Sequence, residues 1–267
     1  MARPKKHYGQ HFLHERGIIE RIVAAIAPQP GERVVEIGPG EGALTLPLLD
    51  AAHALTAIEL DTELIEPLRA AALAHGELTI IHADVLEVDF TALAAGGKLR
   101  LAGNLPYYVS SPILFHCLKH ARVITDMVFM LQKEVVDRMA AAPGSKTYGR
   151  LSVMLQLACK VEPLLRVPPG AFRPPPQVDS AVVRLIPHAI PLDAEVDSAR
   201  IEAIVRAAFG QRRKTLSNAL SGLLNAEVIR AAGIDPKARA ETVSPREYVE
   251  LARLADLRHS GILADNP

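Results

Sequence analysis

VVEIGPGEG, residues 34–42, joins a short apolar run to a turn that contains three glycines. Residues 33–37 are predicted to form a buried strand, and a helix is predicted to begin at Ala43. Glycines let the backbone of such a turn approach a ligand closely, and the N-terminus of the following helix favours an anionic group. The stretch therefore predicts the opening of a nucleotide-binding α/β unit.

An acidic residue ends the next predicted strand, residues 55–60. Glu59 follows Gly38 by 21 residues, which is where a carboxylate accepts hydrogen bonds from the ribose hydroxyls of a bound nucleotide. Glu36 and the glycines at 38, 40 and 42 fit the E-x-G-x-G-x-G pattern of S-adenosylmethionine sites better than the G-x-G-x-x-G pattern of dinucleotide sites. We therefore predict Gly38, Gly40 and Glu59 as cofactor-binding residues.

A third predicted strand, residues 78–82, is followed by Ala83 and Asp84. The Asp84 carboxylate is placed to accept an N–H of the cofactor's adenine. The alternative is that Asp84 only caps a turn, which is a common position for aspartate.

Asn104, Leu105, Pro106 and Tyr107 follow another apolar run, residues 99–102, with Gly103 between them. Open α/β sheets bind ligands at the carboxyl ends of their strands. The Asn104 side-chain oxygen and the Leu105 carbonyl can accept the two hydrogens of an aromatic amine while Tyr107 stacks on its ring. The alternative interpretation is a strand that ends in a proline turn with a capping asparagine.

A proline-rich loop, residues 168–176, carries Phe172 and Arg173. Proline holds such a loop extended. Phe172 is predicted to supply a second stacking face, opposite Tyr107, for a base taken out of its stack. The alternative is a rigid connector whose phenylalanine fills a gap in the core.

The composition describes a well-packed protein: 267 residues, 49% of them hydrophobic, and two cysteines far apart in the chain. Free thiols and the lack of an apolar leader segment predict a cytoplasmic protein, and no apolar run is long enough for a membrane helix. The net charge is zero. However, residues 22–100 carry four Lys or Arg and twelve Asp or Glu, whereas residues 101–190 carry ten and five. An acidic cofactor half beside a basic face for a polyanion explains this division, and ordinary variation of solvated charge is the alternative.

Two domains are predicted, because strands alternate with helices up to about residue 190 and only helices follow. Residues 1–190 form the α/β domain with an N-terminal arm, and residues 191–267 form a small helical domain. Arg212, Arg213 and Lys214 lie at the start of a helix predicted over residues 214–224. The helix macrodipole disfavours cations at this end unless an anion such as phosphate is bound, so the three residues are predicted to bind RNA. A solvated charge run is the alternative. No metal site is predicted, because His116, Cys117 and His120 lack a fourth ligand.

Taken together, these motifs resemble the KsgA/RsmA family of small-subunit ribosomal RNA adenine dimethyltransferases. The resemblance extends from about residue 8 to past residue 218 and rests on these stretches of the sequence: GQHFL, VVEIGPGEGALT, AIELD, GNLPY, FMLQKEV, YGRLSVM, PPGAFRPPPQVDSAVVRL and QRRKTLSN.

The family implies an α/β fold of class I S-adenosylmethionine-dependent methyltransferases, which is Rossmann-like with a mostly parallel seven-stranded sheet, and a helical C-terminal domain. It implies transfer of four methyl groups to two adjacent adenines near the 3′ end of 16S rRNA, in immature small ribosomal subunits. Independently of the family, a monomer is expected, because the sequence has no exposed heptad pattern or long apolar face for self-association. Carried over by motif, the cofactor contacts fall on His11, Leu13, Gly38, Glu59, Asp84 and Asn104.

The chain departs from the family pattern at two positions. His11 stands where the family usually has Asn, and Tyr108 stands where Asn usually follows the N-L-P-Y motif. Histidine can still donate or accept a hydrogen bond, so a cofactor contact at His11 is compatible with the change.

Three other functions are alternatives to a small-subunit rRNA methyltransferase. A related enzyme that methylates a large-subunit rRNA adenine shares the glycine loop and N-[LI]-P-Y, but the proline-rich stretch and QRRKT favour the small-subunit enzyme. The protein could instead be a ribosome-assembly factor that binds small subunits without catalysis. The intact Glu59, Asp84 and Asn104 argue against a purely binding role. An NAD-dependent oxidoreductase would need a dinucleotide loop paired with a catalytic acid.

Overall fold

The computed structural model describes residues 11–193, 196–211 and 213–259. The chain divides into two compact units. One contains the residues up to Val136 together with Glu162–Pro187, and the other contains Asp137–Val161 and the residues from His188 onward. The expected division at residue 190 therefore needs a correction, because residues 137–161 also belong to the second unit.

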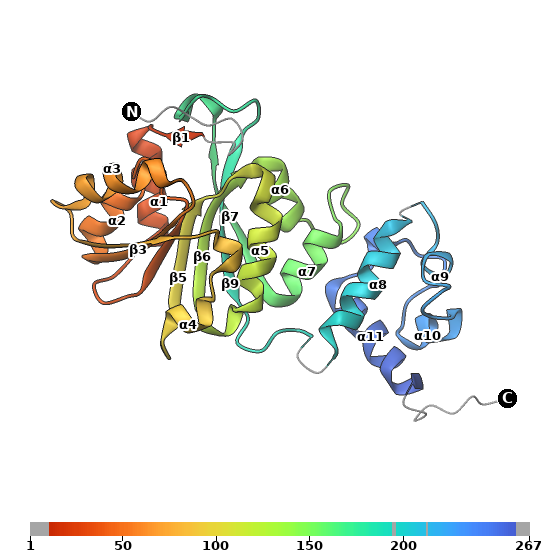
Figure 1. Cartoon of the computed structure of the whole chain (residues 1–267). Coiled ribbons are helices and arrows are strands. Elements are labelled where there is room, and N and C mark those ends of the chain that lie inside the picture. The colour runs from red at the N-terminus through yellow and green to blue at the C-terminus, as the bar shows by residue number, and fades with distance from the viewer. Residues whose placement is uncertain (1–10, 194–195, 212, 260–267) are drawn as a thin grey trace. The chain divides into compact units, whose positions relative to one another are not determined.

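The first unit is built on a seven-stranded sheet with the strand order β4-β3-β2-β5-β6-β9-β7 (Figure 1). The pairs formed by β4, β3, β2, β5 and β6 are parallel, and β9 pairs with β6 in the antiparallel direction. This order confirms the Rossmann-like, mostly parallel sheet. The strands are β2 (Val34–Ile37), β3 (Ala54–Glu59), β4 (Glu77–His82), β5 (Leu99–Asn104), β6 (Ile124–Gln132), β7 (Cys159–Val167) and β9 (Ser180–Pro187).

Helices cover both faces of the sheet because its central strands are apolar on both sides. All four residues of β2 are buried, as parallel strands between two helical layers require. In Figure 1, α1, α2 and α3 lie on one side of the sheet and α5 lies on the other. The helices with residues in this unit are α1 (Arg16–Ile26), α2 (Thr45–Ala52), α3 (Thr62–Ala72), α4 (Phe90–Ala94), α5 (Ser110–Lys119) and α6 (Lys133–Met139).

A two-stranded ribbon forms where the sequence predicts only an arm. β1 (Phe12–Leu13) pairs with β8 (Phe172–Arg173) in the antiparallel direction. Strands of two residues carry no periodic pattern, so their pairing is decided by tertiary contacts alone. The ribbon joins the start of the chain to the proline-rich loop.

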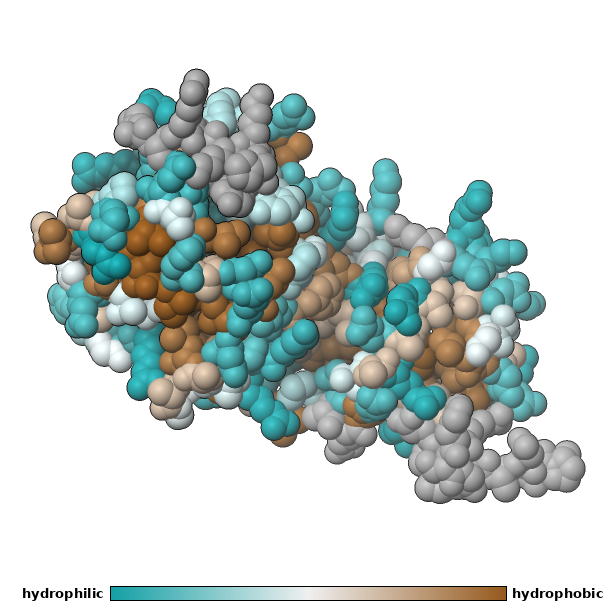
Figure 2. Space-filling view, viewed as in Figure 1, coloured by the Kyte–Doolittle hydropathy of each residue, from teal (hydrophilic) through white to brown (hydrophobic). Residues whose placement is uncertain are grey.

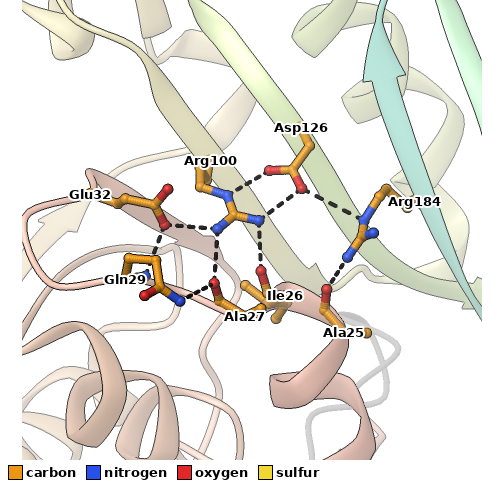
Figure 3. Close-up of polar contacts among 8 residues, drawn as sticks. All are labelled: Ala25, Ile26, Ala27, Gln29, Glu32, Arg100, Asp126 and Arg184. Atoms are coloured by element: carbon orange, nitrogen blue, oxygen red, sulfur yellow. Dashed lines mark hydrogen bonds and ion pairs between the residues drawn. The ribbon is translucent and has the colours of Figure 1, made fainter.

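Arg100 anchors the C-terminal end of α1 to the sheet (Figure 3). Its guanidinium binds both Asp126 carboxylate oxygens, at 2.8 and 2.9 Å, and donates to the carbonyls of Ile26 and Ala27 at 2.6 and 3.1 Å. These carbonyls are among the last of the helix, where intrahelical partners run out. Arg184 contacts Asp126 from β9 and donates to the carbonyl of Ala25.

The second unit packs helices around a core of its own, in which Tyr148 and Tyr248 are fully buried. The Tyr148 hydroxyl donates to the Val243 carbonyl and the Tyr248 hydroxyl to the Ala240 carbonyl, each at 2.9 Å. The helices are α7 (Arg150–Ala158), α8 (Ser198–Gly210), α9 (Leu216–Ala219), α10 (Ala226–Ala231) and α11 (Pro245–His259). The helix expected over residues 214–224 is thus wrong in length: only 216–219 are α-helical, and turns follow.

Candidate functional site

One pocket lies at the carboxyl ends of β2, β3, β4 and β5, where an open α/β sheet binds its ligands. Its walls are largely apolar, and Figure 2 shows a broad apolar area where Figure 1 labels β3. The residues that the sequence predicts for the site and that line this pocket are His11, Leu13, Gly38, Gly40, Glu59, Asp84, Asn104, Leu105, Pro106 and Tyr107. The structure therefore brings together residues spread over 97 positions of the chain.

The glycine turn after β2 adopts a backbone that favours glycine. Gly38 and Gly40 have φ angles of +66° and +58°. A Cβ added at Gly40 would lie 3.2 Å from the ring of Phe12, so the ribbon packs directly on the turn. The Gly40 N–H donates to Glu59 Oε2 at 3.2 Å, which ties the turn to the end of β3.

Two buried carboxyl groups stand beside the turn. Glu59 also accepts the N–H of Asp61 at 2.8 Å, and its burial raises its pKa. Glu36 is 1% exposed and accepts the Thr45 hydroxyl at 2.6 Å. Burial raises the pKa of Glu36 to about 7. Carboxyl oxygens on this side of the pocket suit a ligand that offers hydroxyl donors or positive charge, and they disfavour a pyrophosphate.

Asp84 performs the capping role that the alternative interpretation named. Its Oδ1 accepts the N–H of Leu86 at 2.9 Å at the start of the short helix η2 (Val85–Glu87). The residue also lines the pocket. A turn cap and a position at the pocket wall are compatible, because a carboxylate has two oxygens.

The turn after β5 requires a glycine before Asn104. A Cβ at Gly103 would lie 2.4 Å from the Ile37 carbonyl oxygen of the neighbouring strand β2. The next peptide is held by the Leu105 N–H, which donates to the Met130 carbonyl at 3.0 Å. The close approach of two strands therefore delivers Asn104 and Leu105 to the pocket.

A hydrogen bond orients the Asn104 amide. Its Nδ2 donates to the His11 carbonyl at 3.0 Å. The amide nitrogen is thus directed to the segment next to β1, and Oδ1 is the atom left to accept a hydrogen bond from a ligand. The sequence pattern predicts the asparagine, but the partner that sets its orientation comes from 93 residues away.

Tyr107 is held from two sides by residues that the sequence reasoning did not connect to it. Its hydroxyl lies 2.5 Å from the Ser180 hydroxyl, and its ring stacks on the His11 ring with centroids 5.6 Å apart. His11 Nδ1 in turn donates to the Pro174 carbonyl at 2.8 Å. Ser180 lies in the VDSAVVRL stretch that carries the family resemblance, which is the signal that could have singled it out.

Phe172 does not occupy the predicted stacking position. It is 2% exposed, packs in a hydrophobic cluster with residues such as Leu13, and is not among the residues that line the pocket. Its backbone pairs with Leu13 in the ribbon, which turns the side chain into the core. The structure supports the alternative interpretation, a phenylalanine that fills a gap beneath a rigid loop.

The predicted RNA-binding residues lie in the second unit. Arg213 and Lys214 are exposed in the turn before α9, and Arg212 falls outside the described residues.

His116 contacts the Val88 carbonyl and His120 contacts the Thr91 hydroxyl, each at 2.8 Å. Within the described ranges, no group of three His, Cys, Asp or Glu is placed to hold a metal ion, and no helix is long and apolar enough to cross a bilayer.

A sheet of this strand order, with a glycine turn after its first central strand and a buried acid at the end of the next, defines a class I S-adenosylmethionine-dependent methyltransferase. A family model described as ribosomal RNA adenine dimethylase matches residues 1–257. The chain belongs to this family, and it is an rRNA methyltransferase that uses S-adenosylmethionine.

The relatives that resemble the chain cover nearly all of it. The ribosomal RNA small subunit methyltransferase A of Xanthomonas campestris pv. campestris (strain B100) is 59% identical over 253 residues, 95% of this chain and 97% of that protein. The enzyme of the same name from Xanthomonas oryzae pv. oryzae (strain PXO99A) is 59% identical over 254 residues, with the same coverage of both chains.

Two solved structures share the fold. A dimethyladenosine transferase from Plasmodium falciparum has a TM-score of 0.81 and 26% identity, covering 94% of this chain and 98% of that one. The 23S rRNA methyltransferase ErmE has a TM-score of 0.72 and 28% identity, covering 92% and 99%.

Proposed function

We propose that the protein transfers methyl groups to the N6 atoms of two adjacent adenines near the 3′ end of 16S rRNA, in immature small ribosomal subunits. The observation that supports this most directly is the Asn104 amide, whose nitrogen is bound to the His11 carbonyl and whose oxygen is left for the pocket. The relatives at 59% identity are named for the small subunit, which favours the small subunit over the large one as the substrate.

The residues of the pocket fit the cofactor. The glycine turn lets its backbone come close to a ligand, and Glu59, fixed by the N–H groups of Gly40 and Asp61, is placed for ribose hydroxyls. Asp84 retains one oxygen for the adenine, and His11 and Leu13 close the pocket from the ribbon side. S-adenosylmethionine supplies, when bound, an electrophilic methyl group on a sulfonium.

The chain's own residues activate and hold the target amine. Asn104 Oδ1 accepts one N–H of the adenine and the Leu105 carbonyl accepts the other, so the nitrogen lone pair is drawn out of conjugation with the ring. Pro106 restricts the turn that holds these two acceptors, and Tyr107 stacks on the base. After transfer, the methylated amine loses its proton to water, so no strong protein base is required.

The stacking contribution is comparable with the cost of exposing the target. Base–aromatic stacking is worth roughly 1–3 kcal/mol per base, and unstacking a nucleotide costs a few kcal/mol. Tyr107 is suited to this role because Ser180 and His11 fix its ring before the RNA arrives. The exposed Arg213 and Lys214 are proposed to bind RNA phosphate, together with Arg212.

We further propose that the enzyme acts as a monomer in the cytoplasm. Cys117 and Cys159 are buried, and no disulfide joins them, which suits a reducing compartment. Sedimentation of the purified protein, with and without RNA, measures the oligomeric state directly.

The test uses small subunits from a strain that lacks this modification, methyl-labelled S-adenosylmethionine, and mapping of the label on the rRNA. Wild type is expected to produce dimethyladenine at two adjacent positions near the 3′ end. Asn104→Ala is expected to lower the methylation rate by about 100-fold or more, as loss of one preorganised hydrogen-bonding group does in other active sites, while the Kd of the cofactor changes less.

Gln29→Ala is the matched control, because Gln29 is an exposed amide that does not line the pocket. Label on large-subunit rRNA alone would move the substrate to that subunit. Tight binding of small subunits with no label on any rRNA would favour a function as an assembly factor. Unimpaired turnover by Asn104→Ala would refute the role of the amide.

A further inference from the structure

Tyr108 presents an aromatic ring to solvent at the mouth of the catalytic pocket. It lines the pocket and is 57% exposed. A side chain with this exposure contributes little to a hydrophobic core, so part of the ring is accessible to a ligand at the pocket.

Tyr107 and Tyr108 face different directions because of the backbone between them. They open the short 3-10 helix η3 (Tyr107–Val109), which is closed by the Val109 N–H on the Pro106 carbonyl at 3.2 Å. With three residues per turn, neighbouring side chains point about 120° apart. Tyr107 therefore turns inward to Ser180 and His11, and Tyr108 turns outward.

The backbone that carries Tyr108 is held firmly. The Ser110 hydroxyl donates to the Tyr107 carbonyl at 3.1 Å, and α5 begins at Ser110. An aromatic side chain on a fixed backbone loses little conformational freedom on binding, which makes it an efficient contact surface.

We propose that Tyr108 stacks on the base next to the target adenine in the RNA, so that one tyrosine holds the base being methylated and the next holds its neighbour. This inference rests on the proposed function. Because the two target adenines are adjacent, one of them stacks on Tyr108 while the other is methylated over Tyr107.

The position of Tyr108 favours an RNA base over the adenine of the cofactor. Asp84, the residue proposed for that adenine, follows β4, whereas Tyr108 follows β5. The two strands are separated by β3 and β2, and three strand spacings amount to about 14 Å. Along the chain, Tyr108 instead directly follows the residue proposed to stack on the target.

The test combines protein variants with altered RNA. Small subunits are reconstituted with rRNA whose 3′ segment is a ligated synthetic oligonucleotide. In this oligonucleotide an abasic residue replaces each of the two adenines in turn, and methylation of the other adenine is followed. Wild type, Tyr108→Phe, Tyr108→Ala and the control Leu73→Ala are compared; Leu73 is 82% exposed and lies outside the pocket lining.

Tyr108→Ala is expected to lower kcat/KM on intact subunits by about 5- to 150-fold, the range that loss of one stacked base gives, with the cofactor Kd from calorimetry unchanged. Tyr108→Phe and Leu73→Ala are expected to match wild type. For one of the two replacements, the one that removes the base over Tyr108, the abasic residue should slow wild type by the same factor as Tyr108→Ala. It should slow Tyr108→Ala no further, because both changes remove one contact.

Three results would overturn the inference: wild-type kinetics for Tyr108→Ala, a loss of cofactor affinity in that variant, or effects of the variant and the abasic residue that multiply. The first and third leave the proposed function intact, and the second assigns the ring to the cofactor. If wild type methylates none of these subunits, the proposed function itself fails and the role of Tyr108 fails with it.

Discussion

Replacing Arg100 by alanine would remove the central cation of the contact between α1 and the sheet. Arg100 and Asp126 are direct partners in the β5–β6 register, and their side chains are only 14% and 11% exposed. The guanidinium also binds Glu32 at 2.7 Å and two carbonyls at the end of α1. These hydrogen bonds, with that of Asp126 first, raise the pKa of Arg100, so it is charged at every accessible pH.

The expected loss follows from what alanine would leave behind. Among the described residues, the Asp126 carboxylate would then keep Arg184 alone as a cationic partner, with the Arg184 Nε at 3.6 Å. Removing one member of a buried ion pair typically costs about 3–5 kcal/mol, because the remaining charge stays desolvated. Arg100→Ala is therefore expected to lower the free energy of unfolding of the sheet unit by about that amount, a large part of the stability of a typical domain.

The double variant Arg100→Ala/Asp126→Ala separates the pair from the individual residues. It is expected to be about as stable as Arg100→Ala, or more stable, because no carboxylate remains unpaired. Arg16→Ala is the matched control, because Arg16 lies on α1, the helix that Arg100 anchors. The ion pair between Arg16 and Glu20 is equally short, 2.8 Å, but the Arg16 side chain is 91% exposed. Exposed pairs contribute about 0–1 kcal/mol.

Two measurements report the result. Urea unfolding followed by far-UV circular dichroism gives the free energy of unfolding, and hydrogen exchange of peptides from α1 shows whether that helix opens first. A loss in Arg100→Ala no greater than in Arg16→Ala, with unchanged exchange in α1, would refute the anchoring role.

Further variants test the backbone, a carboxyl group and the second unit. Gly103→Ala is expected to lose about 1–3 kcal/mol in thermal unfolding because its Cβ would meet the Ile37 carbonyl at 2.4 Å, whereas Gly170→Ala, with nothing within 4 Å, should lose about 0.5 kcal/mol or less. Glu36 has its pKa raised from 4.5 to about 7, so its contribution to stability is complete below pH 4.5 and is lost as the pH rises through 7. Urea titrations from pH 5 to pH 8 should therefore show stability falling by up to roughly 3 kcal/mol in wild type and a flatter profile in Glu36→Gln, and equal slopes would contradict this. Tyr248→Phe should cost the second unit about 0.5–1.5 kcal/mol in urea unfolding, because the buried Ala240 carbonyl loses the tyrosine donor and keeps only the long hydrogen bond from the Val243 N–H, at 3.4 Å. An unchanged midpoint would show that the tyrosine hydrogen bond contributes little.

The strands of the sheet could be predicted closely from the sequence because each is a short apolar run with a clear end. The runs at residues 55–60 and 99–102 became β3 (Ala54–Glu59) and β5 (Leu99–Asn104), with small differences in length. Burial on both faces needs only apolar residues, which are visible in a single sequence. The glycine turn and Glu59 could be predicted for the same reason, since their spacing is local.

Pairings between distant segments could not be predicted. Phe12 and Phe172 belong to a ribbon of two-residue strands, and neither strand has a periodic pattern. Residues 137–161 join the helical unit because Tyr148 and its neighbours complete that core, which depends on residues about 100 positions later in the chain.

Asn104 shows where sequence and tertiary structure divide. The residues 103–107 determine by themselves that an amide, a carbonyl and an aromatic ring stand together after a strand, because proline and glycine restrict the local backbone. Contacts from His11, Ser180 and the ribbon decide which atom of the amide faces the pocket. They also decide that Phe172 is buried in the core. Those contacts are made by segments far apart in the chain, and only packing of the whole unit brings them within hydrogen-bonding distance.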